Sequence, residues 1–237
     1  MKKYKIYFLL FTIFSNTLIS QNLADKKVLV VWGGWDGHKP ELFANHVENW
    51  LIKEKADYKI INGLDAYDNY DELIKYDLII QSVTMDEISK EQEENLVKAV
   101  LNGVGIAGAH GGLVDSFRKN TNYQFMIGGQ FVAHPGGMIK HKVKILDDEL
   151  TIGLSDFDIL SEQYYMHYDP SVKIIAETKF GGEVYPWIKD VIMPVAWKKM
   201  YGKGKVFFIS IGHDPDEFMV YKDGWELLKR GFIWAVR

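Results

Sequence analysis

The 237-residue sequence contains no cysteine, which excludes disulfide bonds, thiolate metal sites and a cysteine nucleophile. It also lacks a basic excess, since its formal net charge is −4, and this argues against a nucleic-acid partner. It contains no internal repeat and no low-complexity segment. A hydrophobic fraction of 47% is ordinary for a globular protein, and the length suits one large α/β domain or two small ones.

The first twenty residues have the pattern of a secretory signal peptide. Three lysines precede a mostly apolar run over 6–19, which is too short for a comfortable transmembrane span, and the small Ser20 follows. We expect cleavage near Ser20 and a periplasmic or secreted protein with no stable membrane insertion afterwards. An uncleaved N-terminal anchor is the alternative, because Leu18 or Ile19 stands where a small residue is usual. The missing cysteine rules out a lipoprotein.

From residue 27 onward, short apolar runs alternate with segments of helical periodicity. This pattern predicts strands over 27–32, 58–61, 77–81 and from 104, and helices over 40–55 and after 89. Ser89 and Gln92 have the spacing of a capping box at the start of the second helix. Buried strands that alternate with helices predict an α/β fold with a doubly wound, mostly parallel sheet. We expect a single domain over 27–237.

The second half of the chain is less regular. It predicts a short helix over 122–127, an edge strand over 140–146, strands over 172–177, 191–197 and 205–211, and a final helix to 235. The lysines of the 140–146 segment would discourage edge-to-edge pairing. Asp223 is the predicted cap of the final helix.

The stretch from Val104 to Arg118 organises the chain. It begins as a buried strand and then reaches His110, which is followed by two glycines that permit a sharp turn. A side chain at such a turn projects above the carboxyl end of a parallel sheet, where ligands of open α/β folds bind. Asp115 and Arg118 lie three residues apart, so one helical turn places them on one face. The alternative is a tight turn with a capping Asp and a surface Arg.

Other polar side chains also stand where strands are predicted to end. Trp35 and His38 follow the first strand, and His213 and Asp214 follow the last. Further candidates come from the segments around 128–135 and 161–169; they are Gln130, His134, Glu162, Tyr164 and His167. Glu162 and Tyr164 share a face if their segment is extended, whereas His167 points to the opposite face. The alternative for the 161–169 segment is an amphipathic strand with one solvent-exposed face. The alternative for the tryptophans is that they belong to the core.

Six motifs, taken in order, resemble the ThuA-like (trehalose utilisation) family. They lie at 109–112, 115–118, 128–135, 161–165, 193–197 and 202–213. The resemblance implies a flavodoxin-like fold of the class I glutamine amidotransferase type. In true amidotransferases the turn after this strand carries a nucleophilic cysteine, and His110 occupies the corresponding turn here. The resemblance therefore implies no glutaminase activity by that route. It also implies a setting in sugar catabolism that involves 3-keto-glycosides.

The resemblance and the predicted signal peptide together imply a secreted carbohydrate-processing enzyme acting on 3-keto-glycosides. A base would remove the proton at C2, a cation would stabilise the enolate, an acid would protonate the departing oxygen at C1, and hydration would complete net hydrolysis. Histidine supplies groups near neutral pKa without tuning. The predicted catalytic residues are His110, His134, Glu162, His213, Asp115 and Arg118. The predicted substrate-binding residues are Trp35, His38, Gln130, Tyr164, His167 and Asp214.

Two functions of other classes compete with this one. A non-catalytic sugar-binding module would use the same surface without turnover. A metal-dependent hydrolase would use several histidines and Glu162 as zinc ligands, although the sequence has no H-E-x-x-H motif. No cofactor is assigned, and a divalent metal stays open. The expected partner is a small-molecule carbohydrate, and self-association into a homo-oligomer is left open.

Overall fold

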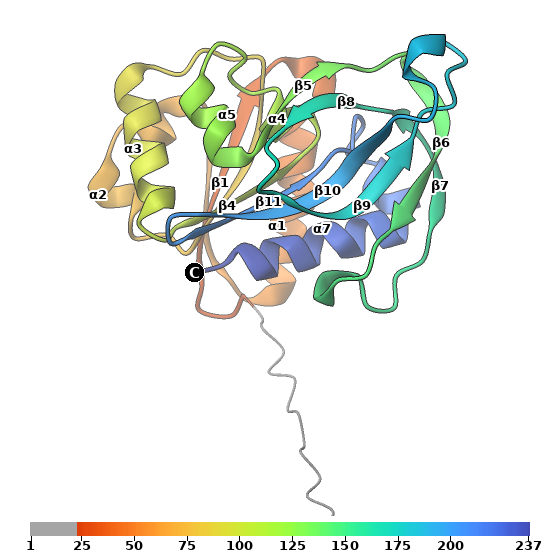
Figure 1. Ribbon diagram of the computed structural model, residues 1–237. Helices are drawn as coiled ribbons and strands as arrows, with labels where there is room; N and C mark the ends of the chain where they lie inside the picture. Colours follow the sequence, from red (N-terminus) through yellow and green to blue (C-terminus); the bar gives the residue numbers. More distant parts are fainter. Residues whose placement is uncertain (1–22) are drawn as a thin grey trace, which may run out of the picture.

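The computed structural model describes residues 23–237, so the predicted signal peptide lies outside the described residues. A nine-stranded sheet runs through the molecule in the order β2-β1-β3-β4-β11-β10-β9-β6-β7, and helices cover both of its faces (Figure 1). The five strands from β2 to β11 are parallel to one another, and the remaining four are antiparallel. The predicted α/β fold class is therefore confirmed.

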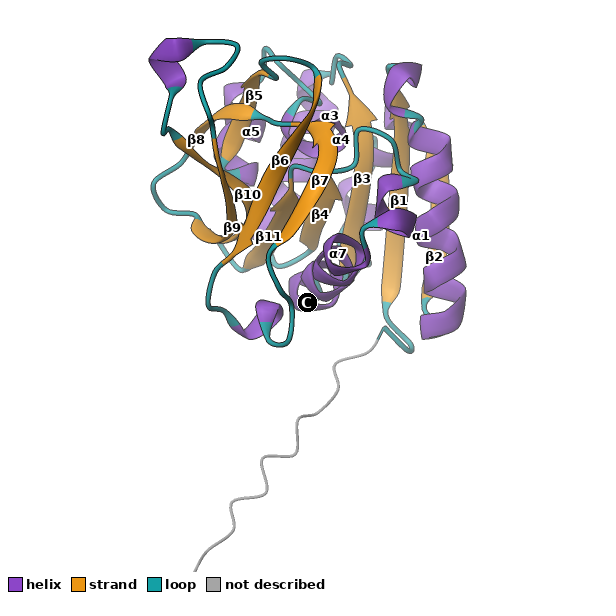
Figure 2. Ribbon diagram, turned by 90° about the vertical axis from the view of Figure 1, so that its right-hand side faces the viewer, coloured by secondary structure: helices purple, strands orange, loops and turns teal. Residues whose placement is uncertain are grey.

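The parallel half of the sheet is built from the strands that the sequence pattern indicates. They are β1 (Lys27–Gly34), β2 (Asp57–Asn62), β3 (Leu78–Thr84), β4 (Gly105–Ala109) and β11 (Gly204–Ile209). Every residue of β3 and β4 is buried, as expected of parallel strands that helices cover on both faces. The carboxyl ends of these strands meet at one edge, which is the upper edge in Figure 2.

Two apolar layers form the core, one on each face of the sheet. Val28 and Val30 pack under α1 (Pro40–Glu54) and α7 (Lys222–Ala235), while Leu29 and Val31 face the layer of α3 (Lys90–Leu101) and α5 (Thr121–Ile127). This division follows from the strand period of two, which sends successive side chains to opposite faces. The shorter helices are η1 (Asp36–His38), η2 (Leu64–Tyr67), α2 (Tyr70–Leu73), α4 (Gly111–Val114), η3 (Glu149–Thr151), η4 (Pro186–Ile188) and α6 (Glu217–Val220).

The antiparallel half departs from the predictions. Its strands are β6 (Met138–Ile145), β7 (Phe157–Glu162), β9 (Lys173–Lys179) and β10 (Ile192–Tyr201), and a separate two-stranded sheet joins β5 (Gly129–Ala133) to β8 (Tyr165–Tyr168). The prediction that 140–146 is an edge strand is wrong, because β6 lies between β9 and β7. It pairs with β7 along most of its length, but with β9 only at Lys144 and Ile145. Its exposed alternate side chains gave the appearance of an edge.

The predicted helix ends are partly confirmed. Ser89 and Gln92 form the capping box of α3, with reciprocal hydrogen bonds of 3.1 Å. Asp223, in contrast, lies in the first turn of α7 and does not cap it, because Tyr221 holds the N-cap position. No helix within residues 23–237 is long and apolar enough to cross a membrane.

Candidate active site

His110 stands at the sharp turn between β4 and α4. Its backbone has φ 52° and ψ −143°, an unusual conformation for a residue with a side chain. The two glycines that follow allow neighbouring elements to approach, since a Cβ at Gly111 would lie 2.5 Å from the His38 ring and one at Gly112 would lie 2.8 Å from the Ser82 backbone. The predicted elbow therefore exists, and it brings His110 against the loop after β1.

The backbone just after β11 fixes the orientation of the His110 ring. Nδ1 lies 2.6 Å from the carbonyl oxygen of Ser210, and a carbonyl can only accept, so Nδ1 carries the hydrogen. Nε2 consequently faces Oε2 of Glu162 at 3.1 Å. The Tyr164 ring packs on the imidazole with 4.1 Å between centroids. Both His110 and Tyr164 are buried, so this Tyr is part of the wall of the site.

Glu162, at the end of β7, is the centre of the cluster. Its Oε2 lies 3.3 Å from Nδ1 of His213, and its Oε1 lies 3.7 Å from Nε2 of His134. Burial acts to raise the pKa of this carboxyl, but the close contacts with His110 and His213 outweigh burial and hold the pKa below its ordinary value. Glu162 is therefore a carboxylate, with one oxygen turned to the interior and one to the mouth.

His38 and His213 complete the interior of the cluster. His38 is buried, and its Nδ1 lies 3.1 Å from the Thr84 hydroxyl at the end of β3. Burial and the neighbouring histidines lower its pKa to about 3, so it is neutral at physiological pH. The Glu162 carboxylate raises the pKa of His213. One ligand atom from each of His38, His110, Glu162 and His213 lies within 4.8 Å of the others.

His134 lies at the mouth of the cluster. It follows β5, and its side chain is 43% exposed while Glu162 behind it is 10% exposed. The Phe131 ring stacks on the His134 imidazole, with centroids 5.7 Å apart. His134 is therefore held from two sides and remains accessible to a molecule that arrives from solvent.

Asp115 and Arg118 form the predicted pair on one face of a turn. Asp115 is buried, and its two carboxylate oxygens accept hydrogen bonds of 2.6 and 2.8 Å from the Arg118 guanidinium. The guanidinium also lies 5.7 Å above the Phe131 ring. Because Asp115 is fully engaged in this ion pair, its structural role is to anchor Arg118, and much of the Arg118 charge is already neutralised.

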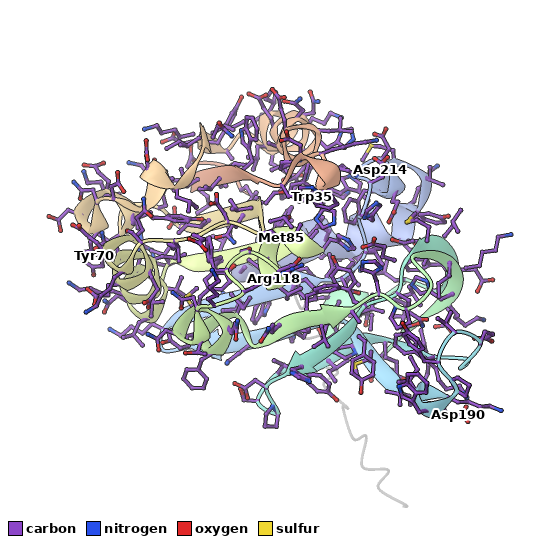
Figure 3. The ribbon with its side chains drawn as sticks, turned by 90° about the horizontal axis from the view of Figure 1, so that it is seen from above. Trp35, Tyr70, Met85, Arg118, Asp190 and Asp214 are labelled. Carbon is purple, nitrogen blue, oxygen red and sulfur yellow. The ribbon has the colours of Figure 1, made fainter. Side chains whose placement is uncertain are left out.

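The remaining predicted residues fall into two groups. Trp35 and Asp214 lie at the rim on the same end of the sheet, where Figure 3 labels them. Trp35 is half exposed and meets His38 edge-on with 4.9 Å between ring centroids, while Asp214 forms an ion pair with Lys39. Gln130 and His167 face each other as a pair in the β5-β8 sheet, and neither belongs to the inner cluster.

Thr84 and Ser210 are two functional residues that no sequence motif marked. Each orients a histidine through its polar atom, and each stands at or just after the end of a parallel strand. That position is the one signal that could have marked them. A backbone carbonyl such as that of Ser210 has no side-chain signature, so its role becomes visible only in three dimensions.

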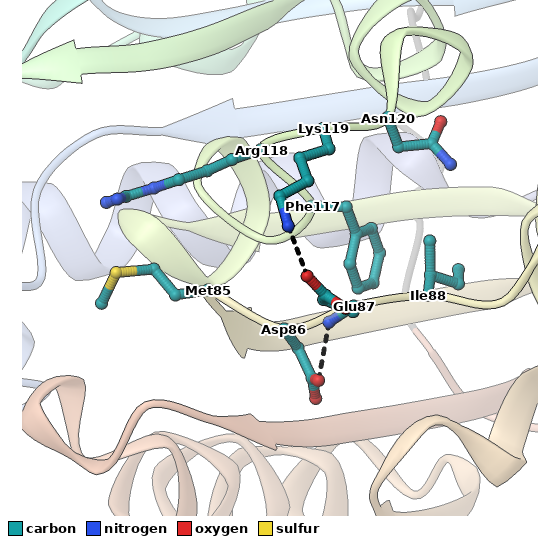
Figure 4. Close-up of a pocket in the computed structure, with 8 residues that line it drawn as sticks. All are labelled: Met85, Asp86, Glu87, Ile88, Phe117, Arg118, Lys119 and Asn120. Atoms are coloured by element: carbon teal, nitrogen blue, oxygen red, sulfur yellow. Dashed lines mark hydrogen bonds and ion pairs between the residues drawn. The ribbon is translucent and has the colours of Figure 1, made fainter.

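A separate pocket of about 420 Å³ includes Arg118 in its lining. It is lined by Met85, Asp86, Glu87, Ile88, Phe117, Arg118, Lys119 and Asn120 (Figure 4). Its charged groups engage one another, since Lys119 donates to Glu87 at 2.6 Å. None of the clustered histidines lines this pocket. We therefore place the chemistry at the histidine cluster, where titratable groups converge, and regard the pocket as adjoining space.

The ThuA family model, described as trehalose utilisation, matches residues 27–235. The chain belongs to the ThuA family. That family carries the description of trehalose utilisation, which places this ThuA protein in carbohydrate metabolism. No curated protein matches the chain.

Solved structures share the ThuA fold. A ThuA-like protein from Bacteroides uniformis has a TM-score of 0.72 at 18% identity, covering 90% of this chain and 92% of that chain. A ThuA-like protein from Parabacteroides merdae has a TM-score of 0.68 at 15% identity, covering 89% and 90% respectively. A β-galactosidase from Bacillus circulans sp. alkalophilus matches with a TM-score of 0.56 at 14% identity over 32% of its own chain. At these identities the likeness concerns the fold, and it confirms the flavodoxin-like architecture.

Proposed function

We propose that this ThuA protein is a carbohydrate-processing enzyme that cleaves 3-keto-glycosides by elimination followed by hydration. The observation that carries the proposal is the convergence of three histidines on the two oxygens of one buried carboxylate, Glu162. Such a set combines groups that exchange protons near neutral pH with a charge that keeps them oriented. The family's place in carbohydrate metabolism supports a sugar as the substrate.

The reaction divides between the mouth and the interior of the site. His134 at the mouth takes the proton from C2, next to the C3 ketone, and the electrons of that C–H bond move into the enolate. The enolate expels the oxygen at C1, which receives a proton from His134, and the product is an enone. Water then adds to C1 with a proton returned to C2, so the overall change is hydrolysis. Oε1 of Glu162 holds His134 in position throughout.

The enolate oxygen requires positive charge nearby. Arg118 was the predicted cation, but both oxygens of Asp115 already engage it. We therefore assign this role to the inner cluster around His110 and His213, and we assign Arg118 to binding other parts of the sugar. Trp35 offers an aromatic face for sugar contact, whereas Tyr164 is buried behind His110 and supports that ring.

The test compares a 3-keto-glucoside with its unoxidised parent. We expect release of the aglycone from the keto sugar alone, and exchange of the C2 hydrogen with deuterium from solvent. Equal turnover of the two substrates would overturn elimination chemistry and favour a metal-dependent hydrolase, the function that the four converging ligand atoms favour second. Binding of the keto sugar without any turnover would make the protein a binding module.

We also propose that the protein is exported and cleaved near Ser20. The support is the lysine-rich start and the apolar run before Gln21. N-terminal sequencing of the protein from its native host should begin close to Gln21 in the periplasmic or extracellular fraction. A cytosolic protein that begins at Met1 would contradict export.

A further inference from the structure

We propose that His38, His110, His213 and Glu162 bind one divalent first-row transition-metal ion. The role of this ion rests on the proposed function, because the ion supplies the positive charge for the enolate. Three imidazoles and one carboxylate are a ligand set that zinc and its neighbours accept. The four donors come from four separate places in the chain, and one atom of each lies within 4.8 Å of the others.

The shorter spacings between the donor atoms match those of a coordination shell. Ligands about 2.0–2.2 Å from a metal are separated by roughly 3.0–3.5 Å when they are neighbours in the shell. Oε2 of Glu162 lies 3.1 Å from Nε2 of His110 and 3.3 Å from Nδ1 of His213. The wider spacings, up to 4.8 Å, would have to shorten when an ion binds.

The hydrogen atoms on His110 are arranged as metal binding requires. Its Nδ1 must donate to the Ser210 carbonyl, which leaves the lone pair of neutral His110 on Nε2, aimed at the Glu162 carboxylate. Two acceptors facing each other need either an added proton or a cation between them. A histidine that binds a metal through one ring nitrogen usually donates the hydrogen of the other to an outer-shell acceptor such as a backbone carbonyl.

His38 and His213 add two further nitrogen donors to the cluster. Thr84 holds Nδ1 of His38, and the ring is buried beside His110 and His213. Nδ1 of His213 is buried and has no hydrogen-bond partner among residues 23–237, although it lies next to Glu162. An ion in the cluster would satisfy that nitrogen and separate it from neighbouring imidazoles.

The ion also explains the division of the site. Arg118 is neutralised by Asp115, so the enolate lacks a free cation unless the inner cluster holds one. With Glu162 bound through Oε2, its Oε1 stays free to position His134 at the mouth. The C3 oxygen of the substrate would then be the fifth ligand, and the ion would polarise the ketone as a Lewis acid.

The experiment measures metal binding directly, apart from turnover. The purified protein is stripped with a chelator and titrated with Zn²⁺, Mn²⁺ and Mg²⁺ by calorimetry and by competition with a chromophoric chelator. We expect one Zn²⁺ or Mn²⁺ per chain and much weaker Mg²⁺ binding, because Mg²⁺ prefers oxygen ligands. His213→Gln, which alters a half-exposed side chain, and His110→Gln should each weaken Zn²⁺ binding by at least about 100-fold, more than the loss of an outer-shell partner.

His134→Ala is the matched control, because His134 contacts Glu162 but is not one of the four ligands. It should keep the Zn²⁺ affinity of the parent protein within a few-fold. Absence of stoichiometric binding, or binding that survives both glutamine substitutions in folded protein, overturns the metal site. Unchanged keto-sugar turnover in metal-free protein overturns the role of the ion at the enolate while the proposed function stands. Stoichiometric Zn²⁺ binding without keto-sugar turnover supports the site and overturns the proposed function.

Discussion

The parallel and antiparallel halves of the sheet contribute different parts of the candidate site. The parallel half supplies His38, His110 and His213 from the turns after β1, β4 and β11, where strand ends of an open α/β sheet deliver side chains to one edge. The antiparallel half supplies Glu162 from the end of β7, and the loop after β5 of the separate two-stranded sheet supplies His134. Three of the histidines thus come from the regular parallel strands, whereas the carboxylate comes from the less regular antiparallel strands.

The largest expected effect comes from removing the charge that the antiparallel half brings. Glu162→Gln keeps the shape of the side chain, and we expect it to lower keto-sugar turnover by roughly 10²–10⁴-fold, the range for loss of acid–base function. That loss corresponds to about 3–5 kcal/mol of transition-state stabilisation. His134→Ala, His110→Ala and His213→Ala should fall in the same range in steady-state assays.

His141→Ala is the control for that comparison. His141 is in the antiparallel half too, but its Nδ1 only contacts the Ile139 carbonyl of its own strand. We expect a change in turnover of no more than a few-fold. If none of the four cluster substitutions lowers the rate tenfold while circular dichroism shows folded protein, the assignment of the active site is wrong.

The seam between the halves should be the place where packing matters most. Trp197 of β10 is fully buried, its ring meets Phe208 of β11 with centroids 4.3 Å apart, and its indole donates to the Ile127 carbonyl at 3.0 Å. Trp197→Ala should lower the free energy of unfolding by about 3–5 kcal/mol in urea denaturation. Trp197→Phe, which retains most of the ring, should lose less, and equal losses would contradict a cavity effect.

A smaller, pH-dependent effect is expected from the ion pair beside that seam. The Lys199 ammonium, 2.7 Å from Asp169, lowers the pKa of that carboxyl from 3.8 to about 2. A depressed folded-state pKa stabilises the protein above the unfolded value, and this stability is lost as the pH falls from about 3.8 through 2. Asp169→Asn should therefore cost about 1–2 kcal/mol near pH 6 and progressively less below pH 3.8.

Urea unfolding of both proteins across that pH range measures the difference. Asp190→Asn is the matched control, because Asp190 forms its ion pair with Lys179 between two exposed side chains. Its effect on unfolding should be too small to resolve at any pH. A deficit for Asp169→Asn that stays constant down to pH 2 would contradict the assigned pKa.

The smallest expected effect concerns the elbow of the parallel half. With His110 where amidotransferases carry cysteine, the protein should release no ammonia from glutamine. His110→Cys should also release none, because a nucleophile needs a matched base and oxyanion donors in addition to its own sulfur. A coupled ammonia assay decides the point, and measurable glutaminase activity in the parent protein would contradict the assignment of His110 to this turn.

The sequence by itself determined the parallel half and its three histidines. Apolar runs such as that of β3 and helical periodicity are local signals, and the turn at His110 is marked by its own glycines. Even the Asp115–Arg118 pair is local, since three residues separate its members.

Only the tertiary structure decided how Glu162 meets those histidines. It is 52 residues from His110 in sequence, and β7 was not predicted as a separate strand. The antiparallel pairing of β6 with β7 sets where that carboxylate ends, and pairing between distant strands leaves no periodic mark in either one. The contact of the Ser210 carbonyl with His110 could not be predicted from sequence either, because every residue has a backbone carbonyl.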